Sequence, residues 1–158
     1  MAYIASRLGL ISDTHGLLRP EALAALRGSE LILHAGDIGN PAILEKLSEI
    51  APVVAVCGNN DAGPWASKLP ETVIVEAGEI SIYILHDLSL LDLEPAVAGF
   101  HIVLSGHTHR PESFERKRVF YINPGSAGPR RFSLPVTVAR LDLAVRPWIV
   151  ESIPLVAP

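Results

Sequence analysis

Five short apolar runs, each followed at once by small and polar residues, dominate the chain between residues 8 and 109. They are rich in Ile, Val and Leu, and they have the length of β-strands rather than of helices. A run that is apolar at every position predicts a strand covered on both faces, as in a parallel sheet. In chain order the runs are LGLIS, LILHA, VVAVC, ISIYIL and HIVLS.

Helical patterns lie between these runs. Residues 19–28 place Pro20 where a helix would begin, and residues 40–50 repeat the device with Asn40 as the predicted N-cap. Residues 88–100 also carry a helical pattern, although a proline lies inside it. Early strands that alternate with helices predict a mainly parallel sheet with crossover helices.

The remaining segments change in character and predict hairpins. Residues 72–85, 113–123 and 135–153 each read as two strands around a turn. We therefore expect a second, more antiparallel sheet packed near the first. The chain shows no repeat or linker, and its length suits one core, so we predict a single domain over residues 1–158.

Charge and composition limit the partners that this chain would have. The net charge is −4 and the basic residues are scattered, so we expect no extended nucleic-acid surface. No apolar segment reaches the roughly 20 residues that a membrane helix needs, and we see no signal-peptide pattern. Cys57 is the only cysteine, which excludes an intrachain disulfide and fits a cytoplasmic protein.

Oxygen-bearing and imidazole side chains follow all five runs. In open α/β sheets, ligands bind at the carboxyl ends of the strands, and these side chains are ligands for divalent metals. In an extended segment Asp13 and His15 would face one ion, since alternate residues point the same way. Glycines at 36, 58 and 106 would let the backbone approach the site closely. The candidate metal ligands are Asp13, His15, Asp37, Asn59, His86, His107 and His109.

The ordered motifs DTH, GDIG, GNND, LHD and GHTH resemble the calcineurin-like metallophosphoesterase family, and within it the small YfcE-like phosphodiesterase group. The resemblance implies an α/β fold, a four-layer α/β/β/α sandwich with two packed mixed β-sheets, and a dinuclear metal site. By position it assigns Asp37 as the bridge between the metals. It gives Asp13, His15 and His109 to the first metal, and Asn59, His86 and His107 to the second.

The same resemblance implies a hydrolase in which a hydroxide that bridges two divalent metals attacks phosphorus. Mn²⁺ is the favoured metal, with Fe²⁺, Zn²⁺ or Ni²⁺ as alternatives. Asn59 and Arg130 are the predicted contacts to a small phosphate-ester substrate. Asn60 stands where many relatives carry a histidine general acid, which favours substrates with good leaving groups.

Two other functions fit the sequence. A phosphomonoesterase would use the same metals with a different pocket. A non-catalytic protein-interaction subunit would use the same scaffold, although such a subunit is free to lose metal ligands and this chain has the complete set. Whether the chain forms a homo-oligomer stays open.

Overall fold

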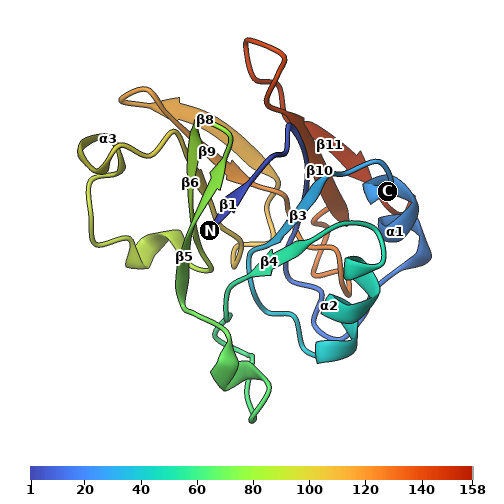
Figure 1. Cartoon of the computed structure of the whole chain (residues 1–158). Coiled ribbons are helices and arrows are strands. Elements are labelled where there is room, and N and C mark those ends of the chain that lie inside the picture. Colours follow the sequence, from blue (N-terminus) through green and yellow to red (C-terminus); the bar gives the residue numbers. More distant parts are fainter. Residues whose placement is uncertain (158) are drawn as a thin grey trace.

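Two β-sheets pack face to face in the computed structural model of the chain (Figure 1). The structure describes residues 1–157, so Pro158, the last residue of the predicted domain, lies outside the described residues. One sheet has six strands in the order β1-β5-β6-β7-β9-β8, and the other has five in the order β11-β10-β2-β3-β4. The predicted pair of packed mixed sheets is confirmed.

The parallel part of the five-stranded sheet consists of β2 (Arg7–Ile11), β3 (Leu31–His34) and β4 (Val53–Ala55). The crossover helices are α1 (Pro20–Leu26) and α2 (Pro41–Ser48), which lie outside this sheet on the right of Figure 1. Pro20 and Pro41 occupy first-turn positions, where no backbone N–H is needed. The Asn40 side chain accepts a 2.9 Å hydrogen bond from the Ala42 N–H, which confirms the predicted cap.

Strands β10 (Thr137–Asp142) and β11 (Glu151–Pro154) complete this sheet as an antiparallel pair. The six-stranded sheet contains two further hairpins. One joins β5 (Thr72–Ala77) to β6 (Ile80–Leu85), and the other joins β8 (Glu112–Arg116) to β9 (Val119–Asn123). All three predicted hairpins are thereby confirmed. Two further strands belong to the same sheet: β1 (Ala2–Tyr3) and β7 (Ile102–Leu104).

The apolar runs are buried on both faces, as predicted. Successive residues of β2 point in opposite directions, so that Leu8 and Leu10 pack between the sheets while Ile11 packs beneath α1 and α2. Burying each such side chain contributes about 1.5–3 kcal/mol. The inter-sheet core also contains Leu31, Leu33, Val54, Val56, Val75, Ile82, Ile84, Ile102, Leu104 and Ile122.

The predicted helix over residues 88–100 is largely absent. The structure instead has a 3₁₀ helix at Leu88–Leu90 and a four-residue helix, α3 (Pro95–Ala98), with Pro95 in its first turn. Proline can begin a helix but interrupts one that is already running, which explains the break. This thin layer covers the outer face of the six-stranded sheet, on the left of Figure 1, and completes the four-layer sandwich. A further 3₁₀ helix spans Ala66–Lys68.

The five apolar runs divide between the two sheets. Strands β2, β3 and β4 lie in one sheet and β6 and β7 in the other. Their carboxyl ends nevertheless meet, because the loops that follow them are in contact. None of the helices in the described residues has the length and apolar character that a membrane crossing requires.

Candidate metal centre

The first group of donors brings together Asp13 and His15, after β2, with His109, after β7. The Asp13 Oδ1 atom lies 3.2 Å from His109 Nε2 and 3.6 Å from His15 Nε2. The two Nε2 atoms lie 3.3 Å apart. Asp13 and His109 are buried, and His15 is half-buried. These three side chains form a compact set of oxygen and nitrogen donors around one point.

A second group consists of Asp13, Asp37 and His86, all buried. His86 Nε2 lies 3.3 Å from Asp37 Oδ2 and 3.9 Å from Asp13 Oδ1. Asp37 Oδ2 also lies 3.6 Å from His15 Nε2 in the first group. Both carboxylates therefore lie between the histidines of the two groups.

Asn59 and His107 lie beside the second group, at the exposed edge of the centre. The His107 Nδ1 and Asn59 Oδ1 atoms are 3.2 Å apart, and the His107 ring meets the His86 ring edge-on at a centroid distance of 5.2 Å. The other ring nitrogen of His107 lies 3.6 Å from Asp87 Oδ2. The structure thus gathers all seven predicted ligand residues into one region.

Unpaired buried atoms provide a test of whether these residues fit metal ions. Asp13 Oδ1 and His86 Nε2 are buried without a hydrogen-bond partner, although such atoms are normally paired in proteins. His86 Nδ1 must donate to the Ala35 carbonyl, 2.7 Å away, because a carbonyl only accepts. That bond leaves the Nε2 lone pair free for a cation. The donors therefore fit divalent metal ions.

Both carboxylates are held ionised. Burial raises the pKa of Asp13, but the nearby imidazoles of His109 and His15 and the hydrogen bond from Ser12 outweigh it and keep the pKa below its usual range. Burial likewise raises the pKa of Asp37, and the nearby imidazole of His86 together with the hydrogen bonds from Asn60 reverses the effect. Burial lowers the pKa of His86, but Asp37 and the Ala35 carbonyl raise it by more, so the net change is an increase. A cation would compete with that proton on His86.

The backbone turns sharply at most of the predicted ligands, which corrects the expectation of an extended DTH segment. Five of them adopt left-handed φ values, where residues other than glycine are uncommon. Asp13 and His15 therefore approach each other through a turn after β2 and not through strand alternation. Such strain is concentrated at functional sites. The φ values are 54° for Asp13, 44° for His15, 54° for Asp37, 71° for His107 and 62° for His109.

Glycine is required beside the ligands because the loops touch. A Cβ atom on Gly106 would lie 2.6 Å from Asp13 Oδ2 and would also collide with Ser12 Oγ. A Cβ atom on Gly36, which has a φ of 100°, would lie 2.8 Å from His86 Nδ1. The close approach predicted at these glycines is confirmed.

Supporting residues hold the two aspartates in place. Ser12 Oγ donates to Asp13 Oδ2 at 2.6 Å. Asn60 donates to Asp37 twice, through its backbone N–H at 2.8 Å and its side-chain amide at 3.0 Å. Asp61 accepts hydrogen bonds from three backbone N–H groups in the loops after β3 and β4. These residues fix the loop geometry but do not themselves belong to the two donor groups.

Asn123 is a supporting residue that sequence reasoning missed. This buried side chain donates to the Gly106 carbonyl at 2.9 Å and to Thr108 Oγ1 at 3.1 Å, and so braces the loop that carries His107 and His109. The sequence feature that could have identified Asn123 is its position at the end of an apolar strand, where the predicted ligands also lie.

Arg130, a predicted substrate contact, directs its guanidinium elsewhere. Its Nη2 atom donates to the Ala157 carbonyl at 2.6 Å, near the end of the described chain. A role for Arg130 in substrate binding therefore stays a prediction.

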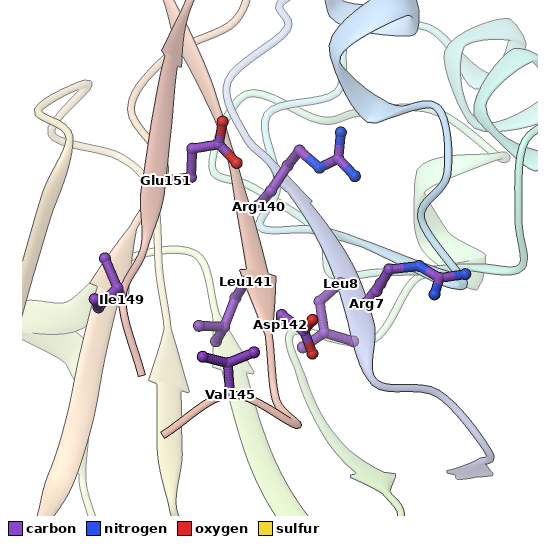
Figure 2. A pocket seen from close by; sticks show the side chains of 8 residues that line it. All are labelled: Arg7, Leu8, Arg140, Leu141, Asp142, Val145, Ile149 and Glu151. Carbon is purple, nitrogen blue, oxygen red and sulfur yellow. The ribbon is translucent and has the colours of Figure 1, made fainter. Parts of the chain in front are cut away.

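Two cavities differ in their relation to the donors. One, of about 360 Å³, shares Gly58, Asn59 and His86 with the metal centre. The other, of about 280 Å³, lies at the opposite end of β2, between Arg7 and the end of β10 (Figure 2). Figure 2 shows Arg7 and Arg140 pointing away from the apolar side chains of this second cavity, and none of the predicted ligands lines it.

The fold is that of metal-dependent phosphoesterases, and comparison with known proteins places the chain in the same class. The calcineurin-like phosphoesterase superfamily domain matches residues 7–146, and the chain belongs to this family. A probable metallophosphoesterase from Methanothermobacter thermautotrophicus is 37% identical over 151 residues, which cover 85% of this chain and 86% of that protein.

Two other similar proteins have solved structures. The phosphodiesterase YfcE from Escherichia coli is 28% identical over 86% of this chain and 87% of its own. Its structure superposes with a TM-score of 0.71 over 94% of this chain and 93% of that chain, at 25% identity. Vps29 from Chaetomium thermophilum superposes with a TM-score of 0.74 over 98% and 99%, at 21% identity, which shows a shared fold.

Proposed function

We propose that this chain is a phosphodiesterase that hydrolyses small phosphate esters with two divalent metal ions. The observation that carries the proposal is the pair of donor groups that meet at Asp13, with Asp37 Oδ2 between His15 and His86. We assign Asp13, His15 and His109 to the first ion and Asp37 to both. We assign Asn59, His86 and His107 to the second ion, and Asn59 also to substrate contact.

Two bound divalent ions would supply the attacking hydroxide and would offset the negative charge that develops on the phosphoryl oxygens. The protein residues perform the positioning. The Ala35 carbonyl fixes the tautomer of His86, and Ser12 and Asn60 orient the two aspartates. Two carboxylates offset only part of the charge of two divalent ions, so the centre would attract an anionic phosphate ester.

The surroundings of Asn60 favour esters with good leaving groups. The backbone N–H and the side-chain amide of Asn60 both donate to Asp37. A side-chain amide cannot act as a general acid at neutral pH. A leaving alcohol would therefore take its proton from water. Mixed carboxylate, amide and imidazole donors suit Mn²⁺, which we favour, as well as Fe²⁺, Zn²⁺ or Ni²⁺.

Hydrolysis of bis-p-nitrophenyl phosphate by purified protein with added Mn²⁺ tests this function. We expect turnover by the wild type and its loss in Asp37→Ala, while Glu151→Gln, in the second cavity, keeps full activity. A higher rate on p-nitrophenyl phosphate than on the bis-ester would indicate a phosphomonoesterase. Metal-loaded protein that turns over none of a broad panel of diesters and monoesters would overturn the proposal and favour a non-catalytic subunit.

A further inference from the structure

The cavity beside the metal centre is the space into which part of a bound ester would extend. Its volume is about 360 Å³, and it shares Gly58, Asn59 and His86 with the centre. His86, which is only 5% exposed, belongs to both, so the cavity opens directly beside the proposed second ion. A diester held at the centre would place one of its two alcohol groups here.

Carboxylates dominate the charge of this cavity. Glu71, Asp87 and Asp92 line it, and its lining, all within the described residues, contains neither Lys nor Arg. Asp87 is fixed in place, because its Oδ1 atom accepts from the Ser89 N–H at 3.0 Å and from the Ser89 hydroxyl at 2.8 Å. Its Oδ2 atom lies 3.6 Å from His107 Nε2, so the acidic wall reaches the centre itself.

No ion pair neutralises Glu71 or Asp92 within residues 1–157. An anionic group in this cavity would face several carboxylates of like charge, whereas these carboxylates would attract a cation and no Lys or Arg in the lining would oppose it. The cavity therefore favours a positively charged group, whereas the metal centre favours a negatively charged one.

The remaining wall is apolar. Tyr83 and Leu85 are buried behind it, and Leu90, which is 73% exposed, forms its edge. A group that combines positive charge with methyl or methylene surface would match both parts of this lining. Substituted ammonium groups have that chemistry.

We propose that the cavity binds an ammonium-bearing alcohol, so that the preferred substrates are phosphodiesters of a cationic amino alcohol. The inference rests on the proposed phosphodiesterase function and specifies its substrate class. Such a diester is negative at phosphorus and positive at one alcohol, which matches a positive metal centre next to an acidic cavity. Diesters whose alcohol carries further phosphate would be excluded.

A pair of esters that differ only in this charge tests the inference. p-Nitrophenyl phosphorylcholine and p-nitrophenyl 3,3-dimethylbutyl phosphate have the same leaving group and similar shape, but only the first carries a quaternary nitrogen. We expect kcat/KM to be about tenfold higher for the choline ester at low salt, and the ratio to fall at high salt. The double variant Glu71→Gln, Asp92→Asn, which keeps only Asp87 of the three carboxylates, should bring the ratio most of the way to one, whereas Glu151→Gln should leave it unchanged.

A binding measurement separates failure of this inference from failure of the proposed function. Tetramethylammonium chloride is titrated into protein supplied with diamagnetic Zn²⁺, with sodium chloride at matched ionic strength as the control. We expect amide shifts at Glu71, Leu90 and Asp92 that disappear in the double variant. Absence of these shifts, or an unchanged ester ratio in a protein that turns over the bis-ester, overturns the inference. Shifts without any turnover overturn the phosphodiesterase proposal alone.

Discussion

The Nε2 atom of His109 lies 3.2 Å from the Oδ1 atom of Asp13, although these residues follow strands of different sheets. Asp13 follows β2 of the five-stranded sheet, and His109 follows β7 of the six-stranded sheet. The candidate metal centre therefore depends on how the two sheets pack and not on either sheet alone.

Asp37 is the residue whose loss should remove both metals. Its Oδ2 atom lies near histidines of both donor groups, and we assign it to both ions, so Asp37→Asn removes a charged donor from each proposed ion. We expect Asp37→Asn to bind almost no Mn²⁺ after dialysis, and His15→Ala to retain about one ion of the two. Elemental analysis measures both. A full equivalent of manganese on Asp37→Asn would show that Asp37 is not the bridge.

His107 should be replaced better by glycine than by alanine in metal-free protein. Both substitutions remove the imidazole, but only alanine keeps a Cβ at a φ of 71°. We expect His107→Gly to have a free energy of unfolding about 1 kcal/mol higher than His107→Ala. Urea denaturation in the presence of a chelator measures the difference. Equal stabilities would mean that the backbone at this position is not strained.

Asn123 should support metal binding without contacting a metal. Asn123→Asp keeps the shape of the side chain and removes the donor to the Gly106 carbonyl and Thr108 Oγ1. We expect a loss of about 1–3 kcal/mol in the free energy of unfolding and weaker Mn²⁺ binding. Ser113→Ala, on the exposed neighbouring strand β8, is the control for unfolding and for metal titration. Unchanged metal affinity in Asn123→Asp would remove the bracing role.

Glu30 should make stability depend on pH at a site remote from the metal centre. The Arg7 N–H, the Ser6 N–H and the Ser6 hydroxyl donate to this carboxylate at 2.9, 3.0 and 3.1 Å, and they lower its pKa from 4.5 to about 2. Above pH 4.5 the group is ionised in folded and unfolded chains alike, and its stabilising effect is complete.

As the pH falls from 4.5 towards 2, the unfolded chain takes up the proton first, so this contribution to stability is lost. We expect the stability difference between wild type and Glu30→Gln to shrink through that window, as measured by urea denaturation at successive pH values. Glu79→Gln, in the exposed β5–β6 turn, serves as the comparison. A difference that stays constant with pH would contradict the assigned hydrogen bonds.

Several parts of the fold could be predicted because they depend on local sequence. Pro20 and the Asn40 cap mark where α1 and α2 begin, and pairs of strand-like segments around a short turn mark the hairpins. The division of the five apolar runs between two sheets could not be predicted, because strands that are buried on both faces have the same pattern in either sheet. The short helices between residues 88 and 100 depend on how Leu88 and Phe100 pack on the six-stranded sheet.

The candidate site could likewise be predicted from the sequence only in part. Residue type and position after a strand were enough to select Asp13 and His86. Residue type and position could not predict the conformation that brings them together, since the left-handed turn at Asp13 is stabilised by contacts with distant loops. The direction of the Arg130 side chain likewise depends on Ala157, a contact that no local pattern predicts.

The division of the donors between the two sheets has a consequence beyond catalysis. A pair of cations bound there would cross-link the two sheets, because separating the sheets would require breaking the coordination bonds. The protein's resistance to heat and to proteases would then rise with the free concentration of the metal. Its lifetime in the cell would follow the local supply of that ion.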